Sequence, residues 1–262
     1  MRKSVVIDCL PESVHRYRAG FAIVAVDVIR ATTTAITAAA SGRRCFPVPT
    51  IEAALALARK FKNPLLAGES AGTMPAGFEM DNSPAQLIRR TDTHRPLVLV
   101  SSSGTKVIHE AAECEATYLG CFRNHSILAA HLTQHHPRVA IIGAGSKGEF
   151  REEDQICCAW IAAGLMSKGY IPENPQTTSI VTRWRDAPPT ACLRSHSVDF
   201  LERTGRLCDL EFILEHIDDL RAVFPVENGE VKMIPKEQAP ARTCRVDSRV
   251  SGRRCNRMLS DE

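Results

Sequence analysis

The chain has 262 residues with a formal net charge of +3, and 44% of its residues are hydrophobic and 24% charged. This balance is ordinary for a globular protein, and the weak charge with 5% aromatic residues argues against nucleic acid as a partner. No apolar run approaches the ~20 residues of a membrane-spanning helix, and residues 1–15 lack a signal-peptide pattern, so we expect a cytoplasmic protein with no membrane partner.

Strand-like and helix-like segments alternate along the first two thirds of the chain. Residues 4–10 and 21–27 are apolar runs typical of buried strands, and residues 32–42 predict a helix that Gly42 ends. Further strands are predicted at 45–48, 64–69, 96–101, 116–120 and 138–143, and further helices at 50–61, 83–90, 102–112, 126–134 and 152–167. This rhythm predicts an α/β fold of three layers, α/β/α, around a largely parallel central sheet.

The rhythm changes after Gly169. Residues 170–189 are interpreted as a connection, and short helices are predicted at 197–203 and 209–216. Residues 223–234 predict a C-terminal hairpin with an Asn-Gly turn. Beyond Lys236 the chain is rich in Arg and has little periodicity. We therefore assign residues 1–236 to a folded domain and 237–262 to a disordered tail.

The strongest concentration of polar side chains follows the strand predicted at 21–27. Asp27 ends this strand, and its carboxylate is of the kind that holds a divalent metal at the ligand-binding edge of an α/β sheet. Arg30 offers a planar fork that matches phosphate oxygens. Thr32, Thr33 and Thr34 begin the next helix, where free N–H groups favour an anion. Helix capping by Asp27 and one threonine is the alternative, but three consecutive threonines exceed what capping needs.

Two further strand-to-helix junctions carry groups suited to anions. The turn at 101–105, "SSSGT", offers hydroxyls and backbone amides, although an ordinary Ser/Thr turn has the same composition. The loop at 143–154 contains Lys147 and the acidic residues Glu149, Glu152, Glu153 and Asp154. Its G-x-G-x-x-G pattern invites a dinucleotide-binding interpretation, but the second strand ending in an acidic residue is missing.

A Gly/Pro-rich loop follows the strand predicted at 64–69. Glu69 ends that strand, and Gly72 and Gly77 allow the loop to bend back. Asn82 and Ser83 are helix caps by default, because Pro84 suits the first position of the next helix.

Taken together, these segments resemble the ComB-like 2-phosphosulfolactate phosphatase family, magnesium-dependent enzymes of the coenzyme M route. The resemblance covers roughly residues 4–234. It is carried by "DVIRATTT" at 27–34, "GES" at 68–70, "GFEMDNSP" at 77–84, "SSSGT" at 101–105 and "GSKGEFREED" at 145–154.

The resemblance implies hydrolysis of the phosphomonoester of a small anionic 2-phospho-hydroxyacid, such as (2R)-2-phospho-3-sulfolactate. It implies Asp27, Arg30 and Glu69 as catalytic residues, with Mg²⁺ held by Asp27, Glu153 and Asp154. The phosphate or substrate would be bound by Thr32, Thr33, Thr34, Asn82, Ser83, Ser102, Ser103, Gly104, Thr105 and Lys147.

Four positions depart from the family pattern. Ser70 stands where the family has Arg, Asp81 where it has Gly, Ser103 where it has Asn, and Arg151 where a small polar residue is expected. These departures motivate a second hypothesis, a non-catalytic protein that still binds phosphate or another anion. An NAD(P)-binding oxidoreductase ranks third, and whether the chain forms a homo-oligomer is left open.

Overall fold

The larger of two sheets is built from the apolar runs that the sequence marks most strongly. The structure, a computed structural model, describes residues 2–236. Five parallel strands form this sheet in the order β6 (Ala116–Gly120), β2 (Ala22–Val26), β7 (Arg138–Gly143), β1 (Ser4–Cys9) and β8 (Ile171–Pro172). β2 is buried along its whole length, as its uninterrupted apolar sequence predicts.

Three shorter parallel strands form a second sheet, which is extended by the C-terminal hairpin. Its order is β10 (Val226–Glu227), β11 (Glu230–Val231), β3 (Cys45–Val48), β5 (Leu97–Val100) and β4 (Leu65–Gly68). Asn228 and Gly229 have φ values of 51° and 76°, so the predicted Asn-Gly turn is confirmed. A separate pair joins β9 (Ala222–Val223) to β12 (Ile234–Pro235).

Helices cover both faces of the larger sheet. One face packs against α5 (His125–His135), α6 (Glu152–Met166) and α7 (Pro175–Trp184). The other packs against α1 (Ala31–Ala40), α4 (Gly104–Glu110) and the 3-10 helix η1 (Pro11–Tyr17). The predicted three-layer α/β/α class with a C-terminal hairpin is thus confirmed.

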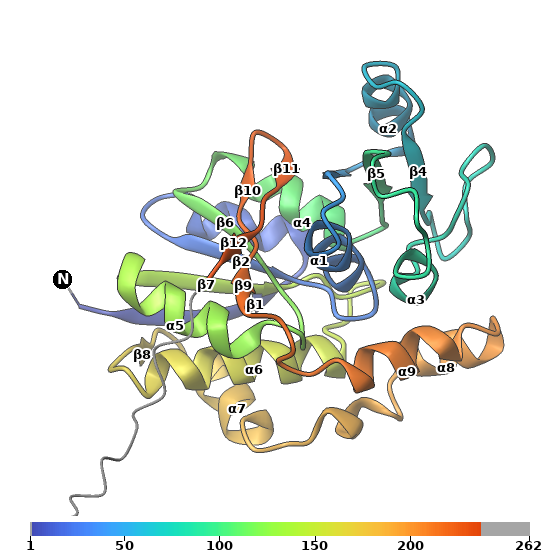
Figure 1. The fold of residues 1–262 in the computed structure, drawn as a ribbon. Helices are drawn as coiled ribbons and strands as arrows, with labels where there is room; N and C mark the ends of the chain where they lie inside the picture. The colour runs from blue at the N-terminus through green and yellow to red at the C-terminus, as the bar shows by residue number, and fades with distance from the viewer. Residues whose placement is uncertain (1, 237–262) are drawn as a thin grey trace, which may run out of the picture.

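The second sheet lies beyond α1, a division that the strand rhythm did not reveal. Figure 1 shows α1 between β2 and the β4–β5 pair, and α1 contacts strands of both sheets. α2 (Ile51–Ala58) covers the outer face of this sheet. The buried side chains of each strand of the larger sheet alternate, so that Val5 and Ile7 face α6 while Val6 packs toward α1 and the second sheet.

The remaining helices lie near the end of β4. α3 (Pro84–Leu87) contacts α9 (Leu207–Glu215), which pairs with α8 (His196–Arg203). Figure 1 shows α8 and α9 side by side below α3. Two 3-10 helices, η2 (Ala111–Glu113) and η3 (Pro189–Cys192), complete the described elements.

The interpretation of residues 170–189 as a connection is wrong, because they contain β8 and α7. Asn174 caps α7 by accepting a hydrogen bond from the Thr177 N–H at 2.8 Å, and Pro175 occupies the first turn. Ile180, Val181 and Trp184 form its buried face. The flanking prolines and polar residues concealed this amphipathic pattern.

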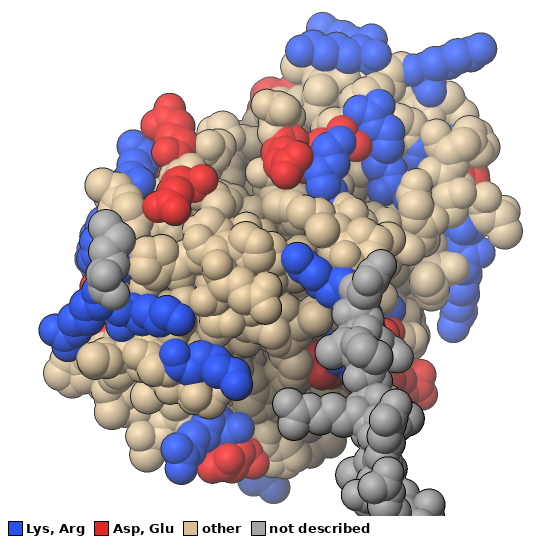
Figure 2. Space-filling view, turned by 60° about the vertical axis from the view of Figure 1, so that its left-hand side comes forward, with Lys and Arg blue, Asp and Glu red and all other residues tan. Residues whose placement is uncertain are grey.

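Three further features are the C-terminal tail, the absence of a predicted membrane-spanning helix and the distribution of surface charge. The tail predicted at 237–262 lies outside the described residues, so the tail and the domain boundary stay predictions. None of the helices within residues 2–236 has the length and apolarity needed to span a bilayer. Figure 2 shows one face of the molecule, where Lys and Arg side chains are scattered with Asp and Glu among them.

Candidate active site

The predicted junctions meet around the carboxylate of Asp27, which follows β2. The turn after β5 touches it, because a Cβ built on Gly104 would lie 2.3 Å from Asp27 Oδ2. Asp154, on the first turn of α6, accepts a hydrogen bond from the Val28 N–H at 2.8 Å. Glu69, after β4, accepts one from the Ser102 N–H at 2.6 Å. Segments far apart in sequence and drawn from both sheets therefore form one site.

The Asp27 carboxylate is buried, with one oxygen engaged by the backbone. Oδ1 accepts a hydrogen bond from the Ala31 N–H at 3.1 Å, while Oδ2 faces Gly104. Burial raises the pKa of Asp27 to about 7, and the negative charges of Glu69 and Glu153 act in the same direction. The Ala31 N–H and the charge of Arg30 oppose this pKa shift. The site therefore favours the arrival of a cation or a proton at Asp27.

Gly104 is required by the close approach of its turn to Asp27. A methyl group there would also lie 2.7 Å from Ala31 Cβ, so it has no room. We expect Gly104→Ala to displace the Asp27 carboxylate and to lower kcat/KM of a reaction at this site roughly 100-fold. Steady-state kinetics on the folded variant measure this effect. Gly42→Ala is the control for the change of glycine to alanine, because the added methyl group has no described atom within 4 Å and the φ of 78° adds only local backbone strain. Equal losses in both variants would contradict the role given to Gly104.

A second acidic centre lies at the start of α6. Asp154 Oδ2 accepts a hydrogen bond from the Gly145 N–H at 3.3 Å, and its pKa is raised well above the usual range by burial and by Asp27 and Glu153. Burial also raises the pKa of Glu153, an effect that the side chains of Ser197 and Ser195 oppose. Glu153 Oε2 is buried and has no hydrogen-bond partner among residues 2–236.

These carboxylates offer hard oxygen ligands, the type that Mg²⁺ prefers. Among the described residues, however, no group of three or more His, Cys, Asp and Glu side chains is arranged to hold a metal ion. Magnesium is usually held by one or two protein carboxylates together with water and substrate phosphate, so a three-ligand cage is not required. Asp27 Oδ2 and Glu153 Oε2 accept none of the hydrogen bonds found within residues 2–236, which suits them to a cation.

Arg30 lies in a buried ion-pair network. It donates to Asp209 Oδ2 at 2.6 Å, to Asp81 Oδ1 at 2.7 Å and to Asn82 Oδ1 at 2.7 Å. Asp81, which replaces the glycine of the family pattern, also pairs with Arg206. Both terminal nitrogens of Arg30 are thus engaged with the protein, and its predicted contact with phosphoryl oxygens stays a prediction.

The three threonines use their hydroxyls to fix the turn before α1. Thr32 Oγ1 accepts from the Asp27 N–H at 2.9 Å and lies 2.8 Å from the Gly120 carbonyl oxygen. Thr33 donates to the Val28 carbonyl at 2.8 Å, and Thr34 donates to the Asn82 carbonyl at 2.7 Å. All three are buried. The hydroxyls are therefore engaged with backbone groups, and the predicted contact of the three threonines with phosphate stays a prediction.

Glu69 and Ser102 lock two loops together. Glu69 Oε2 accepts from Ser102 Oγ at 2.8 Å and from the Gly72 N–H at 2.7 Å. Ser102 Oγ in turn accepts from the Ala71 N–H at 2.8 Å. With both carboxylate oxygens engaged, Glu69 holds the loop after β4 against the turn after β5.

The remaining predicted residues either stabilise a local turn or are at least partly exposed. Ser83 caps α3 by accepting from the Gln86 N–H at 3.1 Å, and Thr105 exchanges hydrogen bonds with Ser101, so both stabilise local turns. Ser103 precedes α4 without a side-chain capping bond, and it is partly exposed. Lys147 is exposed at the tip of a tight turn with a φ of 52°. That turn closes between Ser146 and Glu149, and α6 begins only at Glu152, unlike a dinucleotide-binding loop.

Sequence reasoning missed the contribution of α8 and α9. Asp209 is fully buried and accepts hydrogen bonds from Arg30, from Ser83 Oγ and, at 3.1 Å, from the Ala85 N–H. Ser195 and Ser197 lie beside Glu153. No local pattern marks these residues, because an acid or a serine near a helix start is ordinary capping chemistry.

The chain is similar to one family of known proteins. Residues 8–229 match the family model described as 2-phosphosulpholactate phosphatase. A protein of Pseudothermotoga lettingae named probable 2-phosphosulfolactate phosphatase is 36% identical over 61% of this chain and 67% of its own length. Proteins of the same name from Clostridium beijerinckii and Parasynechococcus marenigrum are 30% and 29% identical, over 65% and 84% of this chain and 68% and 90% of their own lengths.

Proposed function

The chain belongs to the 2-phosphosulpholactate phosphatase family, and from this premise we propose that it hydrolyses the phosphomonoester of a small 2-phospho-hydroxyacid. The first substrate to consider is (2R)-2-phospho-3-sulfolactate, which would give 3-sulfolactate and phosphate. The observation that carries the proposal is the buried Asp27 carboxylate, which presents one oxygen at the point where the turns of both sheets converge. A buried carboxylate with a raised pKa in such a place is typical of a reaction centre.

We further propose that the site works with Mg²⁺ held by Asp27 together with Asp154 or Glu153. The ion would neutralise the charge of the phosphate and withdraw electrons from its oxygens. Asp27 is held in a fixed orientation by the Ala31 N–H, so its free oxygen is preorganised before the substrate arrives. Glu69 acts as a positioning residue that keeps the turn at 101–105 in place. Lys147, exposed and near this edge of the sheet, is suited to attract an acidic substrate.

Stability of the metal-free protein is expected to fall as pH rises. Burial places the folded-state pKa of Asp27 at about 7, above its ordinary value, and the pKa values of Glu153 and Asp154 shift in the same direction. Protonated carboxyls therefore stabilise the folded state fully below about pH 4, and this contribution is lost as pH passes about 7. Mg²⁺ needs ionised ligands, so it should restore stability chiefly at high pH.

Thermal unfolding between about pH 5 and pH 8, in EDTA and in MgCl₂, measures this dependence. The melting temperature in EDTA should decline between about pH 6.5 and pH 8, because below that range the lowered pKa values of His125 and His131 oppose the effect of the carboxyls. The gain from Mg²⁺ should be larger at the upper end. CaCl₂ and NaCl of matched ionic strength separate specific binding from screening. A gain from Mg²⁺ that is the same at both ends would contradict the assignment of these carboxylates as ligands.

Phosphate release from a panel of 2-phospho-hydroxyacids tests the proposed function. The panel contains phosphosulfolactate, phospholactate and phosphoglycolate, each with Mg²⁺ and with EDTA. Release that requires Mg²⁺ supports the proposal and ranks the substrates. Phosphate binding without release would favour the non-catalytic alternative, and Ser70, Asp81 and Arg151 would then be reverted to the family residues.

A further inference from the structure

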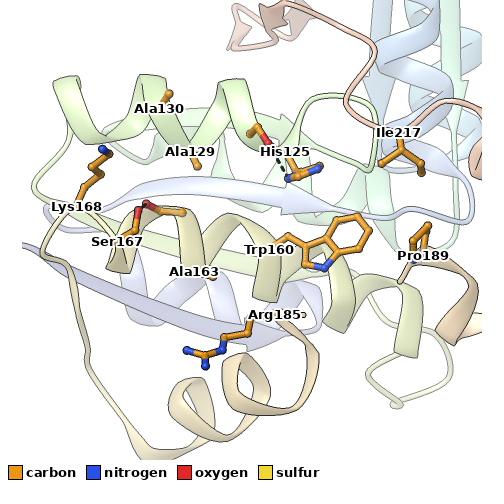
Figure 3. A pocket seen from close by; sticks show the side chains of 12 residues that line it. His125, Ala129, Ala130, Trp160, Ala163, Ser167, Lys168, Arg185, Pro189 and Ile217 are labelled. Carbon is orange, nitrogen blue, oxygen red and sulfur yellow. Dashed lines mark hydrogen bonds between the residues drawn. The ribbon is translucent and has the colours of Figure 1, made fainter. Parts of the chain in front are cut away.

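A cavity of about 570 Å³ lies away from the candidate active site, on the face formed by α5 and α6. It is lined by His125, Ser126, Ala129, Ala130, Trp160, Ala163, Gly164, Ser167, Lys168, Arg185, Pro189 and Ile217. None of these residues belongs to the site around Asp27. Figure 3 shows the cavity running along the two helices, with Trp160 and Pro189 toward one end and Lys168 at the other. Its volume is within the range of small-molecule sites, about 300–1,000 Å³.

The floor and one wall of this cavity are apolar. Small side chains let the two helices approach closely, since a Cβ on Gly164 would lie 2.8 Å from Ala129 Cβ. Trp160 forms the wall, with its ring centroid 4.9 Å from the centroids of both Phe122 and His125. Trp160 is partly exposed, and its ring packs against the rings of Phe122 and His125. Such a supported, partly exposed aromatic surface suits the apolar body of a ligand.

The charge of the lining is entirely positive. Lys168 and Arg185 are both exposed, and the lining contains no carboxylate. Arg185 Nε is 3.1 Å from Asp186, but the two side chains are 60% and 88% exposed, so this pair is weak. Burial lowers the pKa of His125, which keeps its imidazole neutral near pH 7. Among residues 2–236, Lys168 and Arg185 therefore lack a strong anionic partner, and the Asp218 carboxylate beside the cavity lies 4.0 Å from His125 Nε2.

We propose that this cavity is a second binding site, specific for a small amphipathic anion. The apolar or aromatic body of the ligand would lie against Trp160 and the alanines of α5 and α6. Its carboxylate or sulfonate would meet Lys168 at one end of the cavity, and Arg185 would add positive charge from the other side of α6. A small organic acid fits this combination of volume and charge better than a second copy of the chain does. A second copy would need a self-complementary surface, and the lining supplies no carboxylate to meet its own cations.

Binding of 8-anilinonaphthalene-1-sulfonate tests the proposal, with N-phenyl-1-naphthylamine as its uncharged analogue. The sulfonate should bind saturably at one site, at roughly tens of micromolar, the affinity of an ordinary drug-sized ligand. The analogue has the same rings without the anion, so it should bind at least about fivefold more weakly. Energy transfer from tryptophan shows that the bound dye lies close to Trp160 and Trp184, the two tryptophans of the chain, and the variants below locate it in the cavity.

Variants separate charge from apolar contact. Lys168→Gln with Arg185→Gln should weaken binding of the sulfonate about tenfold and leave the analogue unchanged. Trp160→Leu should weaken both dyes. Lys62→Gln is the matched control, because Lys62 is exposed and lies outside the cavity. Cooperative melting of each variant shows that the dyes report on folded protein.

Three outcomes would overturn the proposal. One is sulfonate binding that the double charge variant leaves unchanged. Another is absence of saturable binding to the folded wild type. The third is a dimer, seen by sedimentation velocity, that Trp160→Leu dissociates, because a second copy would then cover this face.

Discussion

Replacing Asp27 with Asn is expected to lower kcat/KM for phosphate release by roughly 1,000-fold. Asparagine keeps the size of the side chain, and its carbonyl oxygen can still accept the Ala31 N–H bond. The variant lacks only the negative charge that would hold Mg²⁺ beside the phosphate. Release from the best substrate of the panel, measured at saturating Mg²⁺, gives the effect.

Stability measurements distinguish this catalytic loss from a structural one. The buried carboxylate has a pKa of about 7, so its ionisation opposes folding in the absence of metal. Asp27→Asn should therefore melt at the same temperature as the metal-free wild type or above it at about pH 8. It should also lose the gain that Mg²⁺ gives. Asp199→Asn, an exposed acid on α8, is the matched control. Activity within tenfold of wild type would remove Asp27 from the proposed mechanism.

The sequence predicted the local junctions of this fold with good accuracy, because their signals are local. β3 falls at the predicted residues 45–48, and α2 is capped by Thr50 as its sequence indicates. The approach of Asp27 to the turn at 101–105 was expected from the shared edge of a single sheet, whereas β2 and β5 belong to different sheets that meet at this point. These predictions needed only hydrophobic period, caps and turn residues.

The division into two sheets could not be predicted in the same way. Strands of both sheets are short apolar runs followed by helices. The sequence of one strand does not indicate which other strand it pairs with. α1 separates the sheets because it is buried all round, including Thr32, Thr33 and Thr34. The same threonines were expected to bind an anion. In the structure the hydroxyls of Thr32 and Thr34 bond to carbonyls distant in the chain, and the binding of an anion stays a prediction.

Arg30 shows how long-range pairing changes the interpretation of a motif residue. In sequence it stands beside Asp27 and suits a phosphate, whereas in the structure its terminal nitrogens meet Asp81 and Asp209. Asp209 is 179 positions away in the chain. No periodicity or spacing links the two residues, so only the folded chain reveals that Arg30 joins the turn before α1 to α9.

Asp209→Ala is expected to destabilise the protein by about 3 kcal/mol or more, the largest stability effect predicted for this site. The change leaves Arg30 buried with one anionic partner removed, and it strips the Ser83 hydroxyl and the Ala85 N–H of their acceptor. Urea unfolding monitored by circular dichroism measures the loss. Asp199→Ala, on the exposed face of α8, should change stability by no more than about 0.5 kcal/mol.

A double variant tests whether Arg30 and Asp209 stabilise the fold as a pair or as separate charges. Removing the buried pair as a unit, with Arg30→Met and Asp209→Leu, leaves fewer uncompensated charges than either single change, so it should cost less than the sum of the two. The same variants also separate two roles for Arg30. If Arg30 only joins α1 to α9, then Arg30→Met and Asp209→Ala should lower kcat/KM of the folded protein alike. A far greater loss in Arg30→Met would assign its guanidinium to the phosphate, because that variant alone removes the positive charge.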